Sequence, residues 1–219
     1  MSEHARLTLY YHPLSSFCQK VLVALYENET PFVPHLLASL DDAQSAAAFK
    51  KIWRIGKFPV LRDEARRQTV AESSIIIEYL DQHYPGRVPL IPEDRGLARQ
   101  VRMQDRFFDL YIQVPMQKIV GDRLRPSNKK DPHGVEQAYA LLETALGMID
   151  EEMVAKTWVV EDRFTMADCA AAPALYYANR VAPFAGHPNA AAYLSRLLTR
   201  PSFARAVEEA APYRHLFPR

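Results

Sequence analysis

The sequence contains few of the residues on which several large protein classes depend. Cysteine occurs only twice in 219 residues, as Cys18 and Cys169. Two cysteines so far apart predict reduced thiols and exclude the disulfide framework of a small secreted protein. Glycine occurs only seven times and forms no G-x-G-x-x-G or G-x-x-x-x-G-K motif. Nucleotide enzymes that cradle phosphates in such loops are therefore not expected.

Charge and hydropathy exclude further classes. The net charge of +1 gives no electrostatic reason to expect nucleic acid or an anionic membrane as a partner. The longest apolar stretch, residues 169–178, is interrupted by Pro173 and is far shorter than the ~18 residues of a membrane span. Residues 1–6 contain no apolar signal core, so we expect a cytoplasmic protein. The seven histidines show no H-E-x-x-H or comparable spacing, which predicts no metal site.

Strand and helix patterns alternate over residues 1–85. Strands are predicted at residues 7–11 and 31–37, and a hairpin is predicted from residues 56–61 and 68–71. Helices are expected to begin at Ser15-Ser16, at Asp41-Asp42 and at Glu72-Ser73-Ser74. The resulting order, βαβαββα, is typical of an α/β layer fold.

The pattern changes after Pro85. Prolines punctuate residues 86–96, which we interpret as a linker between a first domain (1–85) and an all-helical domain (97–219). A long helix is predicted over residues 96–124, with a kink at Pro115. Further helices are expected over the ranges 132–154, 165–177, 189–198 and 202–211.

The turn that leads into the first predicted helix carries the first functional hypothesis. A strand, a proline and then Ser15 and Ser16 place a helix N-terminus at the surface, where unpaired N–H groups and the helix dipole attract anions. We interpret this end as the place that holds and activates the sulfur of a bound thiol. Lowering a thiol pKa from ~8.5 to ~6.5 requires about 2.7 kcal/mol, which one hydroxyl donor and the dipole can supply together. The alternative is that these serines only cap the helix.

Four short motifs follow one another along the chain. They are Ser15-Ser16-Phe17-Cys18 before Lys20-Val21, then Phe58-Pro59-Val60-Leu61, Glu72-Ser73, and Thr165-Met166-Ala167-Asp168. Together, in this order and over nearly the whole chain, they resemble the cytosolic glutathione S-transferase family. The resemblance implies a thioredoxin-like domain that binds glutathione, an all-α helical bundle that carries the second-substrate site, a role in detoxification and commonly a homodimer.

The resemblance implies that the first serine motif activates glutathione. In relatives that use a serine, the hydroxyl at the position of Ser15 donates a hydrogen bond to the thiolate, and Ser16 is the near alternative. Cys18 leaves a different chemistry open, because Ser15-Ser16-Phe17-Cys18 has C-x-x-C spacing with its first cysteine replaced. An exposed Cys18 would favour a thiol oxidoreductase, and a buried Cys18 would act as a small apolar residue.

The next two motifs are implied to bind the rest of glutathione. A cis peptide between Phe58 and Pro59 would present the Phe58 backbone to the ligand, which pairs like an added strand. Lys57 is either a solvated lysine or a partner of the glycine carboxylate. The Ser73 hydroxyl and N–H would bind the γ-glutamyl carboxylate, while Glu72 would accept from its ammonium group. Both residues also suit an ordinary helix start.

The last motif is expected to be structural, and the second substrate is the least defined. Thr165 and Asp168 have the spacing of a capping box, with Asp in place of Glu or Gln.

An apolar electrophile would lie over Ser15 against the long helix. Its candidate wall residues, which a core or a dimer interface would explain equally well, are Phe107, Phe108, Tyr111 and Met116. Related sites also catalyse isomerisation, dehalogenation and peroxide reduction, and other proteins of this fold are non-catalytic binding modules; the sequence does not separate these.

Overall fold

A four-stranded mixed sheet forms the first part of the molecule. The computed structural model describes residues 7–37 and 43–218, so the expected helix start at Asp41-Asp42 lies outside the described residues. The strands are β1 (Leu7–Tyr11), β2 (Val33–Leu36), β3 (Val60–Asp63) and β4 (Gln68–Ala71), in the order β2-β1-β3-β4. β1 is parallel to β2 and antiparallel to β3, and β4 is antiparallel to β3. The predicted α/β thioredoxin-like topology is therefore confirmed.

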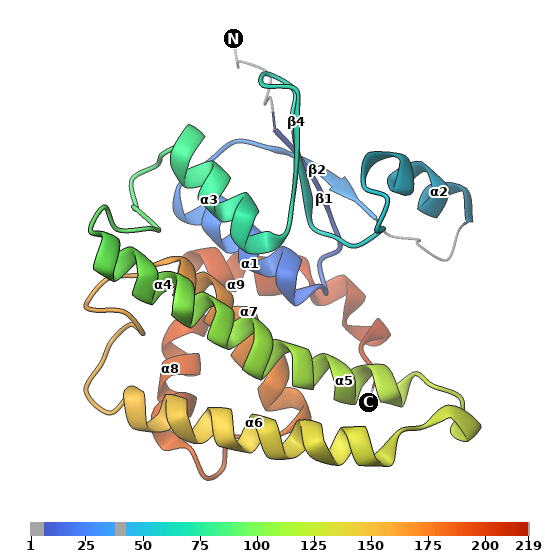
Figure 1. Cartoon of the computed structure of the whole chain (residues 1–219), viewed down its shortest axis with the longest axis vertical. Coiled ribbons are helices and arrows are strands. Elements are labelled where there is room, and N and C mark those ends of the chain that lie inside the picture. Colours follow the sequence, from blue (N-terminus) through green and yellow to red (C-terminus); the bar gives the residue numbers. More distant parts are fainter. Residues whose placement is uncertain (1–6, 38–42, 219) are drawn as a thin grey trace.

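The alternation of side chains along β1 and β3 gives the sheet two apolar faces. Leu9 of β1 lies opposite Leu61 of β3, and both are buried in the main core with α1 (Ser16–Glu27) and α3 (Ser73–His83). The adjacent Val60 belongs to a smaller cluster with Phe49 of α2 (Ala43–Ile52). Figure 1 shows α1 and α3 between the sheet and the helices below, while α2 stands apart from them. The period of two residues along β1 and β3 thus decides which helices cover which face.

The long helix expected after the linker is interrupted by a π-helical segment. It comprises α4 (Arg95–Phe107), the π-helix η1 (Phe108–Gln113) and α5 (Val114–Arg123), which follow one line in Figure 1. The N–H of Val114 donates to the carbonyl of Asp109, five residues earlier. Pro115 has no N–H and its ring crowds the preceding turn, so regular α-helix is disfavoured there. The predicted kink therefore takes the form of a widened turn just before the proline.

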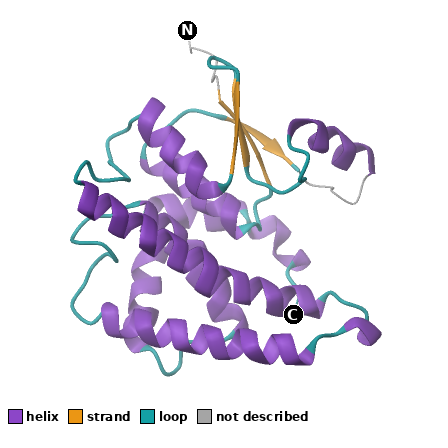
Figure 2. Cartoon of the chain, in the orientation of Figure 1, coloured by secondary structure: helices purple, strands orange, loops and turns teal. Residues whose placement is uncertain are grey.

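The remaining chain is helical, as Figure 2 shows in purple. The helices are α6 (Pro132–Glu152), α7 (Met166–Val181), α8 (Pro188–Leu198) and α9 (Pro201–Glu209), with short 3-10 segments η2 (Ser127–Lys129) and η3 (Ala211–Leu216). The predicted capping box begins α7: the Thr165 N–H and hydroxyl donate to Asp168 Oδ2 at 2.8 and 3.1 Å. No helix in the described ranges has the length and apolar character needed to cross a membrane.

Helix α1 belongs structurally to both parts of the chain. It packs against α3 on one side and against α7 and α9 on the other. At its C-terminal end, the buried Glu27 accepts two hydrogen bonds of 2.6 Å from the guanidinium of Arg200. Nearer its start, Gln19 Nε2 donates to the Tyr177 hydroxyl of α7 at 3.1 Å. The N-terminus of α1 is thereby held in one position between the sheet and the helical bundle.

Candidate functional site

The N-terminus of α1 presents a serine hydroxyl at the edge of a pocket. The turn after β1 is closed by the N–H of Ser15, which donates to the carbonyl of His12 at 3.0 Å. Ser15 is the N-cap, and its oxygen accepts a long hydrogen bond from the Cys18 N–H at 3.4 Å. Its hydroxyl also makes a side-chain hydrogen bond with Cys18. Since the first turn of α1 contains no acidic side chain, nothing there opposes the positive end of the helix dipole.

Cys18 lies on the inner side of the same turn. Its side chain is completely buried, and burial raises the pKa of the thiol to about 12, although a hydrogen bond with Ser15 opposes the rise. A thiol that is both inaccessible and protonated is a poor nucleophile. The expectation of a small, buried apolar residue is confirmed.

One pocket gathers the residues that were assigned to ligand binding. This first pocket has a volume of about 220 Å³. It is lined by Phe17, Trp53, Lys57, Phe58, Pro59, Glu72, Ser73, Val114 and Gln117. The expected cis peptide between Phe58 and Pro59 is present. All five residues of the predicted binding set are therefore brought together from the β3 loop and the start of α3.

Sequence analysis missed the other residues of the first pocket. Phe17 lies on α1, Trp53 follows α2, and Val114 and Gln117 lie on α5. No local motif marks them, because they reach the pocket only through the packing of separate elements. The chain's low tryptophan content, two residues in all, is the one signal that could have drawn attention to Trp53.

The start of α3 has an unusual backbone conformation. Glu72, the residue before the helix, has φ of 70°, in the left-handed region that favours glycine. Such strain in a residue other than glycine is concentrated at functional sites. The exposed Glu72 side chain makes no capping hydrogen bond, so the first N–H groups of α3 are left without a side-chain cap. Ser73 opens the helix and is 5% exposed.

A second pocket adjoins the first and is mostly apolar. It has a volume of about 280 Å³ and shares Phe58 and Gln117 with the first pocket. Its other lining residues are Leu14, Ser15, Ser16, Gln113, Met116, Val120, Tyr177, Leu216, Phe217 and Pro218. Both candidate serines thus face the same cavity, next to the pocket that contains the predicted binding set.

The wall predicted for the second pocket needs correction. Of the four candidates, Met116 lines it, but Phe107, Phe108 and Tyr111 line neither of the two pockets. Phe107 and Phe108 are buried in the core, and Tyr111 is 46% exposed. The physical reason is the π-helix, whose wider turn changes the face on which successive side chains lie. Core packing, the alternative considered from sequence, accounts for both phenylalanines.

A buried charged cluster supports the start of α3 from behind. Lys20 of α1 is 1% exposed, and its Nζ lies 2.6 Å from Asp105 Oδ1, 2.7 Å from Asp109 Oδ2 and 2.9 Å from the hydroxyl of Ser74. Ser74 in turn donates to Asp105 Oδ2 at 2.6 Å. Burial raises the pKa of Asp109, and the nearby Asp105 carboxylate raises it further, while Lys20 lowers it. The cluster ties α1 and α3 to the long helix directly beside Ser73.

His12 lies beside the site without a free acceptor nitrogen. Its Nδ1 accepts from the N–H of Leu14 at 3.2 Å, and its ring lies 6.3 Å from that of Phe58 and 5.5 Å from that of Tyr213. Burial lowers its pKa. Because Nδ1 is engaged in the loop and burial favours the neutral imidazole, we interpret His12 as a structural residue of this turn.

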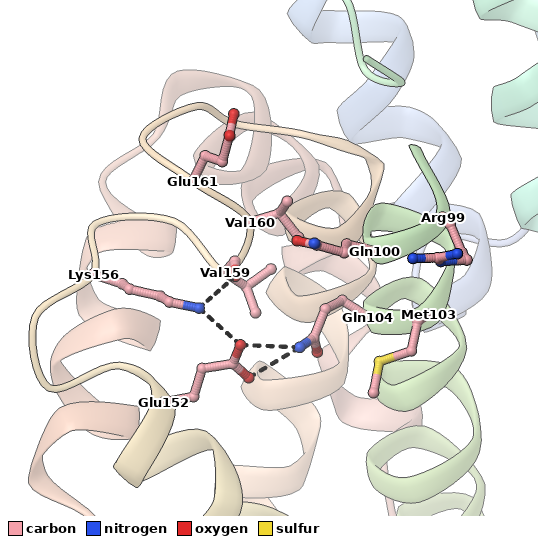
Figure 3. Close-up of a pocket in the computed structure, with 9 residues that line it drawn as sticks. All are labelled: Arg99, Gln100, Met103, Gln104, Glu152, Lys156, Val159, Val160 and Glu161. Carbon is pink, nitrogen blue, oxygen red and sulfur yellow. Dashed lines mark hydrogen bonds and ion pairs between the residues drawn. The ribbon is translucent and has the colours of Figure 1, made fainter. Parts of the chain in front are cut away.

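A third hollow lies away from these pockets, between α4 and the end of α6 (Figure 3). It has a volume of about 400 Å³. Two of its charged side chains pair with each other: Glu152 accepts from Lys156 at 2.9 Å, and it also accepts from the amide of Gln104 at 3.0 and 3.1 Å. None of the residues that line it belongs to the predicted site. Within residues 7–37 and 43–218, no group of three or more His, Cys, Asp or Glu side chains is arranged to hold a metal ion.

Comparison with known proteins gives a consistent family. Residues 9–88 match the model of the glutathione S-transferase N-terminal domain, and residues 107–201 match that of the C-terminal domain. Glutathione S-transferase GstB of Escherichia coli K12 is 23% identical to this chain, and the match covers 92% of this chain and 97% of the length of GstB. The stringent starvation protein A homolog of Haemophilus influenzae is 27% identical, and the match covers 96% of this chain and 94% of the length of that protein.

A solved structure supports the same placement. The glutathione S-transferase from Methylobacillus flagellatus KT, crystallised with GSH bound, is 25% identical and superposes with a TM-score of 0.82. The match covers 91% of this chain and 98% of that structure. Two consecutive family models, full-length relatives and the observed fold all agree. The chain belongs to the glutathione S-transferase family.

Proposed function

We propose that the protein is a glutathione transferase that binds reduced glutathione in the first pocket and adds its sulfur to an apolar electrophile in the second. The observation that carries this proposal is the adjacency of the two pockets. One contains the complete predicted binding set, and the other contains Ser15 and Ser16 within a mostly apolar wall. The related structure from Methylobacillus flagellatus KT has GSH bound, which supports this ligand.

The first pocket suits the two ends of glutathione. The γ-glutamyl carboxylate binds at the uncapped N-terminus of α3, through the N–H and hydroxyl of Ser73. Glu72 accepts hydrogen bonds from the ammonium group beside that carboxylate. The backbone of Phe58 pairs with the cysteinyl peptide, and Lys57 meets the glycine carboxylate. Each charge of the tripeptide then has a partner of opposite sign or a helix end.

The thiolate is stabilised at the second helix end. Ser15 donates its hydroxyl hydrogen to the sulfur, and the dipole of α1 favours the same negative charge. Ser15 acts as a donor and does not become a nucleophile. Ser16 remains the alternative donor because it lines the same pocket.

The rival functions differ in their support. Thiol transfer through Cys18 requires an accessible thiolate, and the burial of this residue argues against it. The second candidate is a protein with the glutathione S-transferase fold that binds ligands or proteins without catalysis. The similarity to a stringent starvation protein A homolog, whose name states no transferase activity, favours it.

Calorimetry with glutathione, followed by an electrophile panel, tests the proposal. We expect the full chain to bind reduced glutathione and to consume at least one apolar electrophile. The Glu72→Ala variant should weaken glutathione binding, whereas Glu151→Ala, on the exposed side of α6, should leave it unchanged. Binding without turnover of any electrophile would favour the non-catalytic protein, and absence of binding would refute the assignment of the first pocket.

The division of the chain and its assembly belong to the same proposal. We assign residues 1–85 to the glutathione domain, 86–96 to the linker and 97–219 to the helical domain. We also propose a cytoplasmic homodimer. Exposed apolar side chains on α3, α4 and η1 support such an assembly: Ile75, Met103 and Leu110 are 45, 57 and 48% exposed. Light scattering at several concentrations measures the mass directly.

A further inference from the structure

The end of α2 and the turn after it, residues 50–57, form a small cationic surface, the basic tip. Lys50 and Lys51 lie in the last turn of the helix, and Arg54 and Lys57 follow before β3. All four side chains are exposed, and none makes a side-chain hydrogen bond or an ion pair with a residue that the structure describes. The net charge of the whole chain, +1, conceals this concentration of four cations within eight residues.

The fold holds the basic tip in a defined shape. Phe49, which precedes it, is 2% exposed in the smaller core cluster, and Ile52 and Trp53 pack partly against that cluster. The chain then turns back, because the N–H of Gly56 donates to the carbonyl of Trp53 at 2.9 Å and Gly56 has φ of 72°. A Cβ at Gly56 would lie 3.2 Å from Lys50 Cε. The cations of the helix end and of the turn are therefore held side by side.

The basic tip also carries exposed apolar surface and no negative charge. Ile55 is 64% exposed, and Trp53 is half-buried. Residues 50–57 include no acidic residue. Glu72 lines the first pocket together with Lys57 but forms no ion pair with it. Cations that alternate with aliphatic and aromatic side chains suit an anionic lipid surface, where the charges meet headgroups and the apolar side chains enter the boundary.

The shape of the basic tip favours a flat partner over a small ligand or a peptide. None of the three hollows described above is lined by Lys50, Lys51, Arg54 or Ile55. Figure 1 shows α2 at the outer edge of the molecule, apart from the other helices. Three of the four cations are lysines, which act as point charges, whereas arginine suits the planar recognition of single carboxylates and phosphates. An exposed aliphatic side chain gains nothing from a nucleic-acid backbone, but it can enter lipid.

We propose that the basic tip docks the protein reversibly on membranes that are rich in anionic phospholipids. Each lysine or arginine near such a surface strengthens binding about five-fold, so four cations act as a weak peripheral anchor. The docking goes beyond the proposed function and does not depend on it. Because Trp53 and Lys57 also line the first pocket, a docked glutathione transferase would work next to the phase in which apolar electrophiles concentrate.

Co-sedimentation with lipid vesicles tests this inference. The full chain is mixed with vesicles of phosphatidylglycerol and phosphatidylcholine in equal amounts, and with vesicles of phosphatidylcholine alone. We expect binding to the anionic vesicles only, and weaker binding as salt is added, since salt screens exposed charges. The tip variant, Lys50→Gln with Lys51→Gln and Arg54→Gln, should lower the partition coefficient about 100-fold. Ile55→Ser should weaken binding by the same factor at low and high salt, because salt does not screen apolar burial.

Two control variants separate local charge from total charge and from folding. The dispersed variant removes three other exposed cations that have no ion pair with a described residue: Arg87→Gln, Arg95→Gln and Lys129→Gln. It has the net charge of the tip variant, but its partition coefficient should change by less than about two-fold. The swap variant, Lys50→Arg with Lys51→Arg and Arg54→Lys, should bind vesicles like the wild type. Calorimetry with glutathione should give the wild-type affinity in every variant, because each retains the residues assigned to that ligand.

Several results would overturn the inference. An equal loss in the tip and dispersed variants would show that only the total charge matters, and equal binding to both kinds of vesicle would remove the role of the cations. No binding to anionic vesicles at low salt would refute lipid docking. Retention of a random-sequence DNA duplex by the wild type, and not by the tip variant, would then assign the basic tip to nucleic acid. A wild-type protein that binds anionic vesicles but not glutathione would support the docking and refute the proposed function alone.

Discussion

Replacing Ser15 by alanine removes the hydroxyl that is proposed to stabilise the glutathione thiolate. A hydrogen bond to a charged acceptor contributes about 1.5–3 kcal/mol. Since one pKa unit corresponds to 1.36 kcal/mol, the pKa of bound glutathione should rise by about 1–2 units in Ser15→Ala. The helix dipole is retained in the variant, so the thiol should still ionise more readily than in water.

The direction of the change in activity follows from this rise. A higher thiol pKa lowers the fraction of thiolate at a given pH, so activity is lost at low pH and recovers as the pH increases. With a wild-type pKa of ~6.5, a rise of one to two units reduces the thiolate fraction at pH 6.5 roughly 5- to 50-fold. The loss of folding stability in Ser15→Ala should be smaller than the loss of thiolate stabilisation. The cap bond from the Cys18 N–H is long, at 3.4 Å, and N-caps contribute only about 0.5–2 kcal/mol.

Ultraviolet difference absorbance of the bound thiolate, recorded across pH, measures the pKa directly, and the pH profile of kcat/KM provides a second reading. Ser16→Ala is the matched control, since it removes the neighbouring hydroxyl from the same pocket. A shift in Ser16→Ala and none in Ser15→Ala would move the role to Ser16. An unchanged titration in both variants would refute the idea that a serine hydroxyl activates the thiol.

Three further predictions concern the buried groups near the site and in the helical domain. Cys18→Ala should leave conjugation largely intact. Native Cys18 should resist thiol reagents at pH 8, because the side chain is buried and its pKa is raised to about 12. Rapid labelling would instead favour a thiol oxidoreductase. Lys20→Met should lower the free energy of unfolding by about 3–5 kcal/mol, because it leaves two buried carboxylates without their cation; a urea titration with little change would contradict this. Asp168→Ala should lower stability and folding yield, since four donor groups lose their acceptor, but should not change glutathione affinity in the folded fraction; normal stability with lost affinity would argue for a direct role.

Much of the fold follows from signals that are local in the sequence. The strands and helices of the first domain have clear periods of two and 3.6 residues, and Ser15 and the pair Thr165 and Asp168 mark helix starts by their hydrogen-bonding side chains. The binding motifs at Phe58-Pro59 and Glu72-Ser73 are each contiguous. They could therefore be recognised before it was known that they line one pocket.

The parts that sequence reasoning missed depend on contacts between distant segments. A lysine on a helix is expected to be solvated, yet Lys20 is buried because Asp105 and Asp109 arrive from the long helix. The candidate wall residues Phe107, Phe108 and Tyr111 were chosen as apolar residues of the long helix, and they lie at or next to the segment where this helix widens. Gln113 gave no signal at all, since an unpaired amide is visible only after every possible partner has been placed.

The position of α1 has a consequence for protein engineering. Of its 12 residues, 10 are buried, and they are covered by the sheet side and by α7 and α9 together. An excised thioredoxin-like module would expose the apolar surface that the bundle now shields, and it would aggregate. A chimera that exchanges this module with a distant relative must therefore transplant the facing surfaces of α7 and α9 as well. The two domains of the chain should therefore be exchanged together, as one structural unit.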